Sequence, residues 1–214
     1  MSETWAAVPV KGFIGAKQRL ATLLNEDQRG ALAAAMLEDV LAALAQARVA
    51  GVLVSTADES AASLARRHGA RVVTEGSRDG HTGAVMAMAR LLRQEGRAAM
   101  LTIPGDVPAI TVAEIDAVVS AARSSNAFVI APARDELGSN AVLCSPPDLM
   151  PLRFGDDSYF PHLRTARRCG IEPTILRLPG FGLDLDHPAD LRAFLTHRPR
   201  KPTRTVALLE GIGV

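Results

Sequence analysis

Three cationic side chains follow the first apolar segment of the chain, within a loop that contains glycine. The stretch reads VPVKGFIGAKQRL, from Val8 to Leu20, and its cations are Lys11, Lys17 and Arg19. Backbone N–H groups in such a loop can form a nest for an anion, and the cations add charge to it. The P-loop pattern GxxxxGK[ST] is absent, and the absence of GxGxxG argues against a dinucleotide enzyme. The alternative is a basic loop that is merely solvated.

Three aspartates lie in two other loops that could hold a divalent cation. Asp106 follows an apolar segment in IPGDVPA, and Asp184 and Asp186 lie in GFGLDLDHPADL. If residues 183–186 are extended, the last two carboxylates project from one face and repel each other unless a cation lies between them. Mg²⁺ prefers a few carboxylates together with phosphate oxygens of a substrate. The alternative role of Asp106 is a helix cap or a turn residue.

A cationic loop combined with three carboxylates is typical of nucleotidyl transfer. Cations hold the triphosphate, Mg²⁺ bridges its oxygens, and an anionic acceptor attacks the α-phosphate while pyrophosphate leaves. An acceptor that is itself a phosphate has a second pKa of about 6 and needs no general base. We therefore interpret His81, His162 and His187 first as binding or structural residues.

The elements that must position these residues alternate between strand and helix. Continuous apolar strands separated by amphipathic helices are typical of a parallel sheet covered on both faces. Helix starts are marked by Asp58 and by Thr111, which Glu114 follows in a capping-box pattern. The expected strands are residues 5–10, 52–55, 71–74, 98–103 and 128–132, and the expected helices are residues 27–47, 60–68, 82–94 and 112–123. We predict a single-domain α/β fold over residues 1–198, with a Rossmann-like, mostly parallel sheet, whose ligands bind beyond the carboxyl ends of the strands.

The pattern changes after Pro132. Gly138-Ser139-Asn140 reads as a turn before a short strand at 141–144, and the loop FGDDS precedes a helix expected at 157–169. A strand at 174–178 and a short helix after Pro188 follow. Both turns offer hydroxyl and backbone donors, and the second begins a helix, where free N–H groups favour an anion. The alternative is that Asp157 or Ser158 simply caps that helix.

Residues 199–214 are expected to form a C-terminal tail. This end of the chain is basic and contains two prolines, so we predict a flexible, solvated segment that could instead embrace a second subunit of a homodimer. Its cations, counted from just before the tail, are Arg198, Arg200, Lys201 and Arg204.

Composition restricts the class of protein. A chain of 214 residues with 48% hydrophobic and 22% charged residues is long enough for one sizeable globular domain. The net charge of +1 argues against a nucleic-acid or membrane-surface binder that works through bulk charge. The two cysteines lack metal-ligand spacing, and no apolar run approaches the roughly 18 residues of a membrane span. We predict a cytoplasmic protein with neither nucleic acid nor membrane as a partner.

Four stretches in this order resemble one known family: VPVKGFIGAKQRLA, IPGDVPA, GSNAVLCSPPD and RFGDDSYFPHL. They are similar to the guanylyltransferases of deazaflavin coenzyme F-420 biosynthesis, which couple GTP to 2-phospho-L-lactate, phosphoenolpyruvate or 3-phosphoglycerate. The resemblance extends to about Leu195 and implies a GT-A-like, MobA-like nucleotidyltransferase fold. It also implies a short-lived product that is handed to the next transferase of the pathway.

The resemblance assigns roles to residues that match the family motifs. It implies Mg²⁺ as cofactor, with Asp106, Asp184 and Asp186 as ligands. The implied catalytic residues are Lys11, Lys17 and Asp106. The implied nucleotide-binding residues are Pro9, Lys11, Gly15, Lys17, Glu75, Gly80 and Asp106. The implied residues for the phospho-acid are Ser139, Asn140, Gly155 and Ser158.

One segment departs from the family pattern. Where the family usually shows Gly-Leu-Asn, this chain reads Gly80-His81-Thr82. The segment lies near the nucleotide in related enzymes, so the replacement bears on base and ribose contacts or on the choice of acceptor. Two other functions stay open at this point. One is a nucleotidyltransferase of the same architecture that makes a nucleoside-diphosphate sugar or a molybdopterin dinucleotide; the other is a non-catalytic nucleotide-binding module, which should lack the carboxylates.

Overall fold

A mixed sheet of seven strands forms the centre of the protein, in a computed structural model that describes residues 3–155, 157–196 and 203–213. The strands are β1 (Thr4–Pro9), β2 (Gly51–Ser55), β3 (Arg71–Val73), β4 (Ala99–Thr102), β5 (Ala127–Pro132), β6 (Ser139–Ser145) and β7 (Thr174–Ile175). Their order is β3-β2-β1-β4-β6-β5-β7. Of these described strands, only β6 runs antiparallel to its neighbours, β4 and β5, which confirms the predicted, mostly parallel α/β sheet.

The helices occupy the connections between the strands. They are α1 (Glu26–Leu44), α2 (Glu59–Arg67), α3 (Gly80–Gln94), α4 (Val112–Ala121), α5 (Tyr159–Arg168), α6 (Pro188–Thr196) and α7 (Arg204–Gly211), with a 3-10 turn, η1, at Gln18–Leu20. Asp58 accepts a hydrogen bond at the start of α2, and Thr111 and Glu114 form a capping box at the start of α4, as predicted. None of the described helices is long and apolar enough to cross a membrane.

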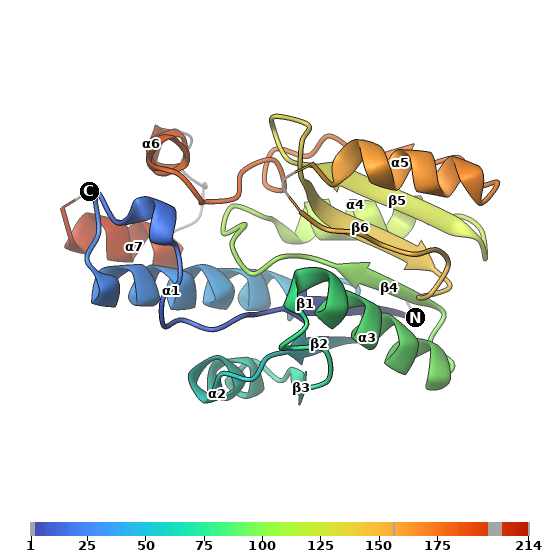
Figure 1. The fold of residues 1–214 in the computed structure, drawn as a ribbon, viewed down its shortest axis with the longest axis horizontal. Coiled ribbons are helices and arrows are strands. Elements are labelled where there is room, and N and C mark those ends of the chain that lie inside the picture. The colour runs from blue at the N-terminus through green and yellow to red at the C-terminus, as the bar shows by residue number, and fades with distance from the viewer. Residues whose placement is uncertain (1–2, 156, 197–202, 214) are drawn as a thin grey trace.

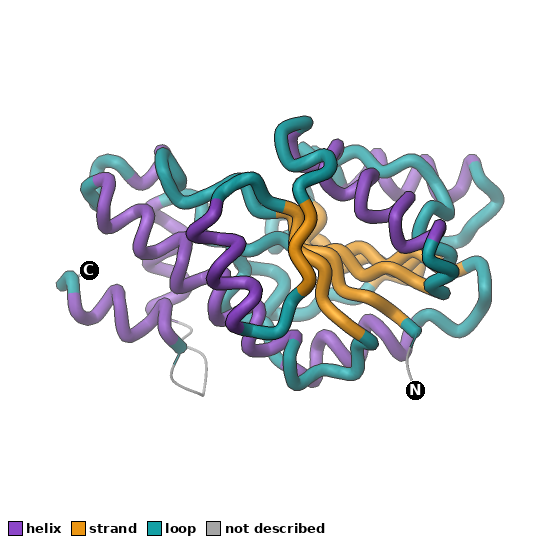
Figure 2. Tube along the Cα trace, turned by 90° about the horizontal axis from the view of Figure 1, so that it is seen from below, coloured by secondary structure: helices purple, strands orange, loops and turns teal. Residues whose placement is uncertain are grey.

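Alternating side chains of the strands bury the two faces of the sheet in separate cores. In β1, Ala6 and Val8 join a cluster with α1, α2 and α4, whereas Ala7 joins a cluster with α3 and α5. Figure 1 shows α3 and α5 in front of the strands, and Figure 2 shows helices on both sides of the sheet. Burial on both faces explains why the strands are continuously apolar in sequence.

The C-terminal segment differs from the expected solvated tail. Residues 204–211 form α7, which lies along α1 (Figure 1), and Leu209 is fully buried in a third core cluster. Asp39 of α1 accepts hydrogen bonds from the backbone N–H groups of Arg204 and Thr205, at 2.8 and 2.9 Å. Buried apolar contacts and capping by α1 therefore order this segment against the domain. The expected tail cations Arg198, Arg200 and Lys201 lie outside the described residues.

Candidate active site

The loops after β1 and β4 meet at the carboxyl edge of the sheet because these strands are neighbours. Lys17 lies in the first loop and Asp106 in the second, and Lys17 Nζ lies 2.7 Å from Asp106 Oδ2. Asp186, from the segment between β7 and α6, places its Oδ1 2.6 Å from the same Nζ. One ammonium group thus joins three segments that are distant in the sequence.

The Lys17 side chain is largely withdrawn from solvent at 10% exposed, whereas the side chains of Asp106 and Asp186 are 29% and 37% exposed. Burial alone would lower the pKa of Lys17, but the carboxylates of Asp106 and Asp186 outweigh burial and raise it above its usual value. Burial alone would raise the pKa of Asp106, but the Lys17 ammonium holds it below its usual range. Lys17 and Asp106 are therefore held in their charged forms.

Asp184, the third predicted metal ligand, lines the same cleft as Asp106 and Asp186 but is held by Asn140. Its Oδ1 accepts a 3.0 Å hydrogen bond from Asn140 Nδ2, which also donates to the Phe181 carbonyl at 2.8 Å. Burial, followed by the nearby charge of Asp106, raises the pKa of Asp184. Between the two predicted ligands, Leu185 is buried and its N–H donates to the Asp106 carbonyl at 3.1 Å. Asp184 and Asp186 consequently line the same cleft, as the alternation of side chains predicted, although residues 183–186 form no strand.

The predicted metal ligands have the right chemistry, but the arrangement here is not that of a metal centre. Carboxylate oxygens are what Mg²⁺ prefers. Among the described residues, however, no group of three or more His, Cys, Asp or Glu side chains converges closely enough to hold a metal ion. The Lys17 ammonium instead lies between Asp106 and Asp186. The assignment of Mg²⁺ to these aspartates stays a prediction.

The opening loop, residues 10–17, turns sharply at two positions that favour glycine. Gly12 has φ +128° and Gly15 has φ +67°. A Cβ atom at Gly12 would lie 2.8 Å from Asp58 Oδ2, so the turn fits closely against the start of α2. Within the described part of the chain, the N–H groups of Gly12, Ile14 and Gly15 make no hydrogen bond. The loop therefore offers backbone donors to an anion, as the sequence predicted.

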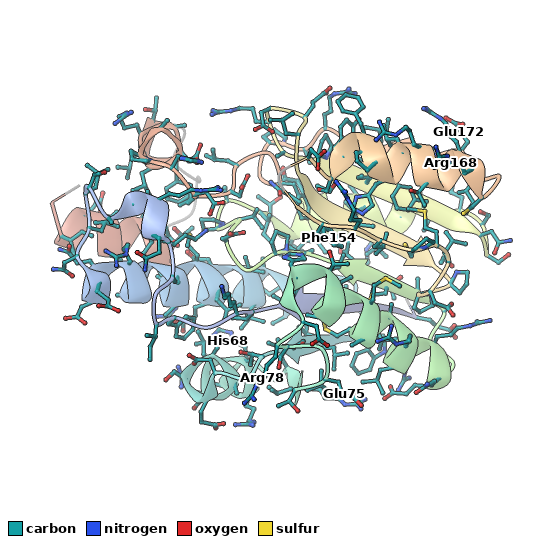
Figure 3. The ribbon with its side chains drawn as sticks, viewed as in Figure 1. His68, Glu75, Arg78, Phe154, Arg168 and Glu172 are labelled. Carbon is teal, nitrogen blue, oxygen red and sulfur yellow. The ribbon has the colours of Figure 1, made fainter. Side chains whose placement is uncertain are left out.

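A cleft of about 910 Å³ runs along this loop, and we call it the opening-loop cleft. Five of the predicted nucleotide-binding residues line it: Pro9, Lys11, Gly15, Lys17 and Asp106. Gly80 lines the neighbouring cleft instead. Glu75 is not among the described residues that line either cleft, and Figure 3 shows it beside β3, away from Phe154.

The second cleft has a volume of about 680 Å³, and we call it the serine cleft. All four residues predicted to hold the acceptor line it: Ser139, Asn140, Gly155 and Ser158. The first two do not lie in a turn, as the sequence suggested, but begin β6, where they are 7% and 6% exposed. The antiparallel pairing of β5 and β6 reaches Ser139, which lies opposite Pro132 after an irregularity in the register, and both side chains line the cleft.

Two hydroxyl groups in this wall are joined to a buried histidine. Ser158 Oγ lies 3.1 Å from Ser139 Oγ, which lies 3.1 Å from Nδ1 of His162. Ser158 occupies the N-cap position of α5, yet its side chain makes no capping hydrogen bond. The alternative reading of Ser158 as a simple helix cap is therefore wrong. The N–H groups of Gly155, Asp157 and Ser158 also make no hydrogen bond within the described residues.

The segment that departs from the family pattern holds one side of the serine cleft. Thr82 Oγ1 accepts a 2.9 Å hydrogen bond from the Phe154 N–H, and the His81 ring packs on the Phe154 ring at 4.6 Å between centroids. Figure 3 shows Phe154 between the start of α3 and α5. His81 and Thr82 thus anchor the loop that leads to Gly155 and Ser158.

The two clefts share a wall. Arg19, His81, Asp106 and Asp186 line both of them. An anion on the backbone donors of the opening loop and a second anion at the paired serines would approach each other across this charged wall. The arrangement suits a reaction between two anionic substrates, in which charge neutralisation and positioning are the main requirements.

A comparison with protein families decides among the functions that the geometry leaves open. The family model for CofC-like guanylyl transferases matches residues 4–214. The chain belongs to this family. As a member of the guanylyl transferase family it is a nucleotidyltransferase, and not a non-catalytic nucleotide-binding module.

Individual relatives differ in the acceptor that their names state. The chain is 38% identical to a phosphoenolpyruvate guanylyltransferase of Conexibacter woesei, over 89% of this chain and 86% of the relative. It is 32% identical to a 3-phospho-D-glycerate guanylyltransferase of Colwellia psychrerythraea, over 86% and 87%. It is 33% identical to a 2-phospho-L-lactate guanylyltransferase of Methanothermobacter thermautotrophicus, over 91% and 85%.

A solved structure confirms the fold class. A putative nucleotide-diphospho-sugar transferase from Desulfovibrio desulfuricans G20 superposes with a TM-score of 0.77 at 19% identity, covering 99% of this chain and 95% of that chain. At this identity the likeness concerns the fold alone. The predicted nucleotidyltransferase fold is therefore confirmed for this guanylyl transferase.

Sequence reasoning missed one anchor of the guanylyl transferase site. Arg29 of α1, only 8% exposed, donates from Nη1 to the Leu24 carbonyl at 2.8 Å and from Nε to the Ala16 carbonyl at 3.3 Å. It fixes the end of the opening loop, and an arginine on an otherwise apolar helical face was the available signal.

Sequence reasoning interpreted His162 as a binding or structural residue, but it did not place His162 or Thr82 in the wall of the serine cleft. Thr82 was noted only as a departure from the family pattern, and the contact of His162 with Ser139 joins residues 23 positions apart. No local pattern in the sequence predicts such a contact.

Proposed function

We propose that this guanylyltransferase couples GTP to a small phospho-acid, namely phosphoenolpyruvate, 3-phosphoglycerate or 2-phospho-L-lactate, as a step of coenzyme F-420 biosynthesis. The observation that carries the proposal is the pair of clefts that share the wall of Arg19, His81, Asp106 and Asp186. A triphosphate and a phospho-acid are the two anions that such a pair of clefts would bring together. The names of the relatives agree with this assignment.

The opening loop would hold the triphosphate of GTP. Its unbonded N–H groups at Gly12, Ile14 and Gly15 would donate to phosphate oxygens, while Lys11 and Lys17 would supply charge. Two of the three N–H donors of the Lys17 ammonium contact Asp106 and Asp186, so the third could donate to a phosphate oxygen. If a phosphate oxygen also replaced one of these carboxylates, an oxygen of Asp106 or Asp186 would be released on the arrival of the nucleotide.

Asp106, Asp184 and Asp186 are the residues that would hold Mg²⁺. When bound, Mg²⁺ would neutralise the negative charge of the triphosphate. The chain itself would keep Asp186 and Asp184 in place through the buried Leu185 between them and through the Asn140 amide. Asp106 would stay fixed at the end of β4, where its carbonyl accepts the Leu185 N–H.

The acceptor would lie in the serine cleft with its phosphate directed toward the shared wall. A phosphate oxygen of the acceptor would form a bond to the α-phosphorus of GTP as the bond from that phosphorus to the leaving oxygen breaks and pyrophosphate departs. The ionised phosphate carries no proton that must be removed, so the reaction needs no general base. This agrees with a site in which His81 and His162 pack against Phe154 in the cleft wall.

The experiment that tests the proposal is a pyrophosphate-release assay with each acceptor. Purified protein is incubated with GTP, Mg²⁺ and one of the three phospho-acids, and the next transferase of the pathway is added to consume a short-lived product. Release of pyrophosphate that depends on one phospho-acid supports the proposal and identifies the acceptor. Release with a sugar phosphate alone would overturn it.

Two further assignments are inferred for the protein in the cell. Cys144 is buried and Cys169 is exposed, and both are free thiols, which suits a reducing cytoplasm. The product would pass to the next transferase of the pathway. Homodimer formation stays a prediction, which the elution volume of the purified protein would test.

A further inference from the structure

A buried histidine lies directly behind the two serines of the serine cleft. His162, on α5, is 1% exposed, and both of its ring nitrogens have partners. Nδ1 lies 3.1 Å from Ser139 Oγ, and Nε2 lies 3.1 Å from the backbone nitrogen of Arg153. The ring is also packed by Phe154, edge to face at 5.0 Å between centroids. These contacts leave the imidazole one orientation.

The partners of His162 determine which nitrogen carries the proton. The Arg153 N–H can only donate, so Nε2 must present its lone pair. A neutral imidazole then carries its proton on Nδ1, which donates to Ser139 Oγ. Burial, reinforced by the nearby charge of Arg153, lowers the pKa of His162 to about 4, which agrees with a neutral ring.

This tautomer decides what the serine pair offers to a ligand. Ser139 and Ser158 have one hydroxyl proton each, and the hydrogen bond between them uses one. Because Ser139 accepts from His162, the second proton stays free for a molecule in the cleft. If Nδ1 were instead an acceptor, it would take the Ser139 proton, and Ser158 would spend its own proton on Ser139. The pair would then present only lone pairs, which repel an anion.

We propose that His162 is a positioning residue that makes the Ser139–Ser158 pair a hydrogen-bond donor to an anionic group of the acceptor. The inference rests on the proposed function and deepens it, because it names the chemical character of the acceptor subsite. The group recognised is a phosphate or carboxylate oxygen. His162 acts only through Ser139 and does not touch the acceptor itself.

Two conservative variants separate the two hydrogen bonds of His162. Asn carries its amide nitrogen the same number of bonds from Cβ as Nδ1, so His162→Asn keeps a donor for Ser139. Gln carries its amide oxygen at the reach of Nε2, so His162→Gln keeps the partner of the Arg153 N–H but removes the donor to Ser139. His68→Gln is the matched control, because His68 is the C-cap of α2 and lines neither cleft.

We expect His162→Gln to raise the acceptor KM about tenfold or more, the effect of losing one well-made hydrogen bond. In His162→Asn the acceptor KM should stay within about threefold of the wild-type value. That ratio corresponds to about half the free energy of one hydrogen bond. The KM for GTP should be unchanged in both variants and in His68→Gln. Equal acceptor KM values for the Gln and Asn variants, or a parallel rise in the KM for GTP, would overturn the proposal.

A readout without turnover separates this inference from the proposed function. Long-range ¹H–¹⁵N NMR spectra of protein with ¹⁵N-labelled histidine should show that His162 carries its proton on Nδ1. The His162 signal is identified because it is absent from the spectrum of His162→Asn. A proton on Nε2 would overturn the inference even if the enzyme is active. If the wild-type enzyme is inactive with all three phospho-acids, the proposed function is overturned. The role of His162 would still be supported if calorimetry shows that His162→Gln loses phosphoenolpyruvate binding and His162→Asn keeps it.

A variant at Ser139 covers the case in which His162→Gln does not fold. Ser139→Ala removes the atom through which His162 acts. We expect the same rise in the acceptor KM with an unchanged KM for GTP. An unchanged acceptor KM in Ser139→Ala would overturn the proposal.

Discussion

The two clefts offer hydrogen bonds to anions in different ways. The opening loop relies on backbone N–H groups, which glycine turns at Gly12 and Gly15 leave unbonded. The serine cleft relies on side-chain hydroxyls, whose donor character depends on the buried His162 behind them. Backbone donors need only the right chain conformation, whereas hydroxyl donors need a partner that sets their direction. The first cleft should therefore be sensitive to backbone strain and charge, and the second to the chemistry of a buried ring.

The largest expected effect lies in the wall that both clefts share. Asp106→Asn removes a carboxylate that contacts Lys17 and is one of the predicted Mg²⁺ ligands. Turnover should fall about a hundredfold or more, because electrostatic stabilisation of the transferring group is a large term. Steady-state kinetics and circular dichroism test whether activity is lost while the fold is kept. Full activity in this variant, or activity that survives removal of divalent cations by EDTA, would show that neither cleft depends on the shared wall.

The buried His162 behind the serine cleft should make the free energy of unfolding of the protein fall in acid. Folding lowers the pKa of His162 from its ordinary value of 6.5 to about 4, so the unfolded chain binds a proton that the folded protein excludes. The contribution of this neutral ring is present above pH 6.5 and is lost as the pH falls to about 4, and it amounts to about 3 kcal/mol. Urea unfolding of wild type and His162→Asn at several pH values isolates it, because the other titrating groups are common to both. Identical pH dependence would contradict a neutral buried ring.

Lys17→Met tests the opening-loop cleft. It removes the ammonium but keeps much of the apolar stem, so kcat/KM for GTP should fall roughly a hundredfold while the acceptor KM changes little. It also leaves Asp106 and Asp186 without their shared cation. Mg²⁺ alone should therefore raise the melting temperature of Lys17→Met more than that of wild type. If calorimetry shows unaltered GTP binding in this variant, the opening loop is a solvated surface that does not bind the triphosphate.

Ser158→Ala is the counterpart in the serine cleft. Ser158 donates to Ser139, and the pair presents one hydroxyl donor to an anion. Such a hydrogen bond contributes about 1.5–3 kcal/mol, so disruption of the pair should lower kcat/KM for the acceptor about ten- to a hundredfold. GTP affinity should be unchanged, because Ser158 lines the serine cleft and not the opening-loop cleft. Fluorescence titration with GTP provides this second measurement. An altered GTP affinity would mean that the two clefts do not bind their ligands independently.

The smallest effect is expected from backbone strain in the opening loop. At Gly12, Ala would adopt φ +128° with its Cβ only 2.8 Å from Asp58 Oδ2, so we expect the KM for GTP to rise several-fold, or by about 1 kcal/mol. Gly69→Ala is the matched control, because Gly69 also has a positive φ, +76°, but its Cβ would meet nothing within 4 Å, and Gly69 lines neither cleft. The control should change only the melting temperature. Equal KM values for GTP in both variants would show that the shape of the opening loop does not matter for binding.

Local patterns in the sequence determined the elements and the chemistry of the site. Apolar strands alternating with capped helices predicted the α/β sheet, and the capping residues Asp58 and Thr111 mark helix starts in the structure. The glycines of the opening loop have the positive φ angles that only such residues adopt easily. The aspartates of DLD line one cleft because side chains alternate along an extended chain. Each of these features depends on residues close together in the sequence.

Only the tertiary structure decided which groups meet. Lys17 was predicted to face a phosphate, yet it lies between Asp106 and Asp186, because β1 and β4 are neighbours in the sheet and the segment before α6 returns to them. The expected tail folds as α7 because Leu209 packs in one apolar cluster with Leu32 and Met36 of α1. His162 and Ser139 face each other only because α5 packs beneath β6 on one face of the sheet. Contacts between distant residues depend on strand order and helix packing, which no short stretch of sequence contains.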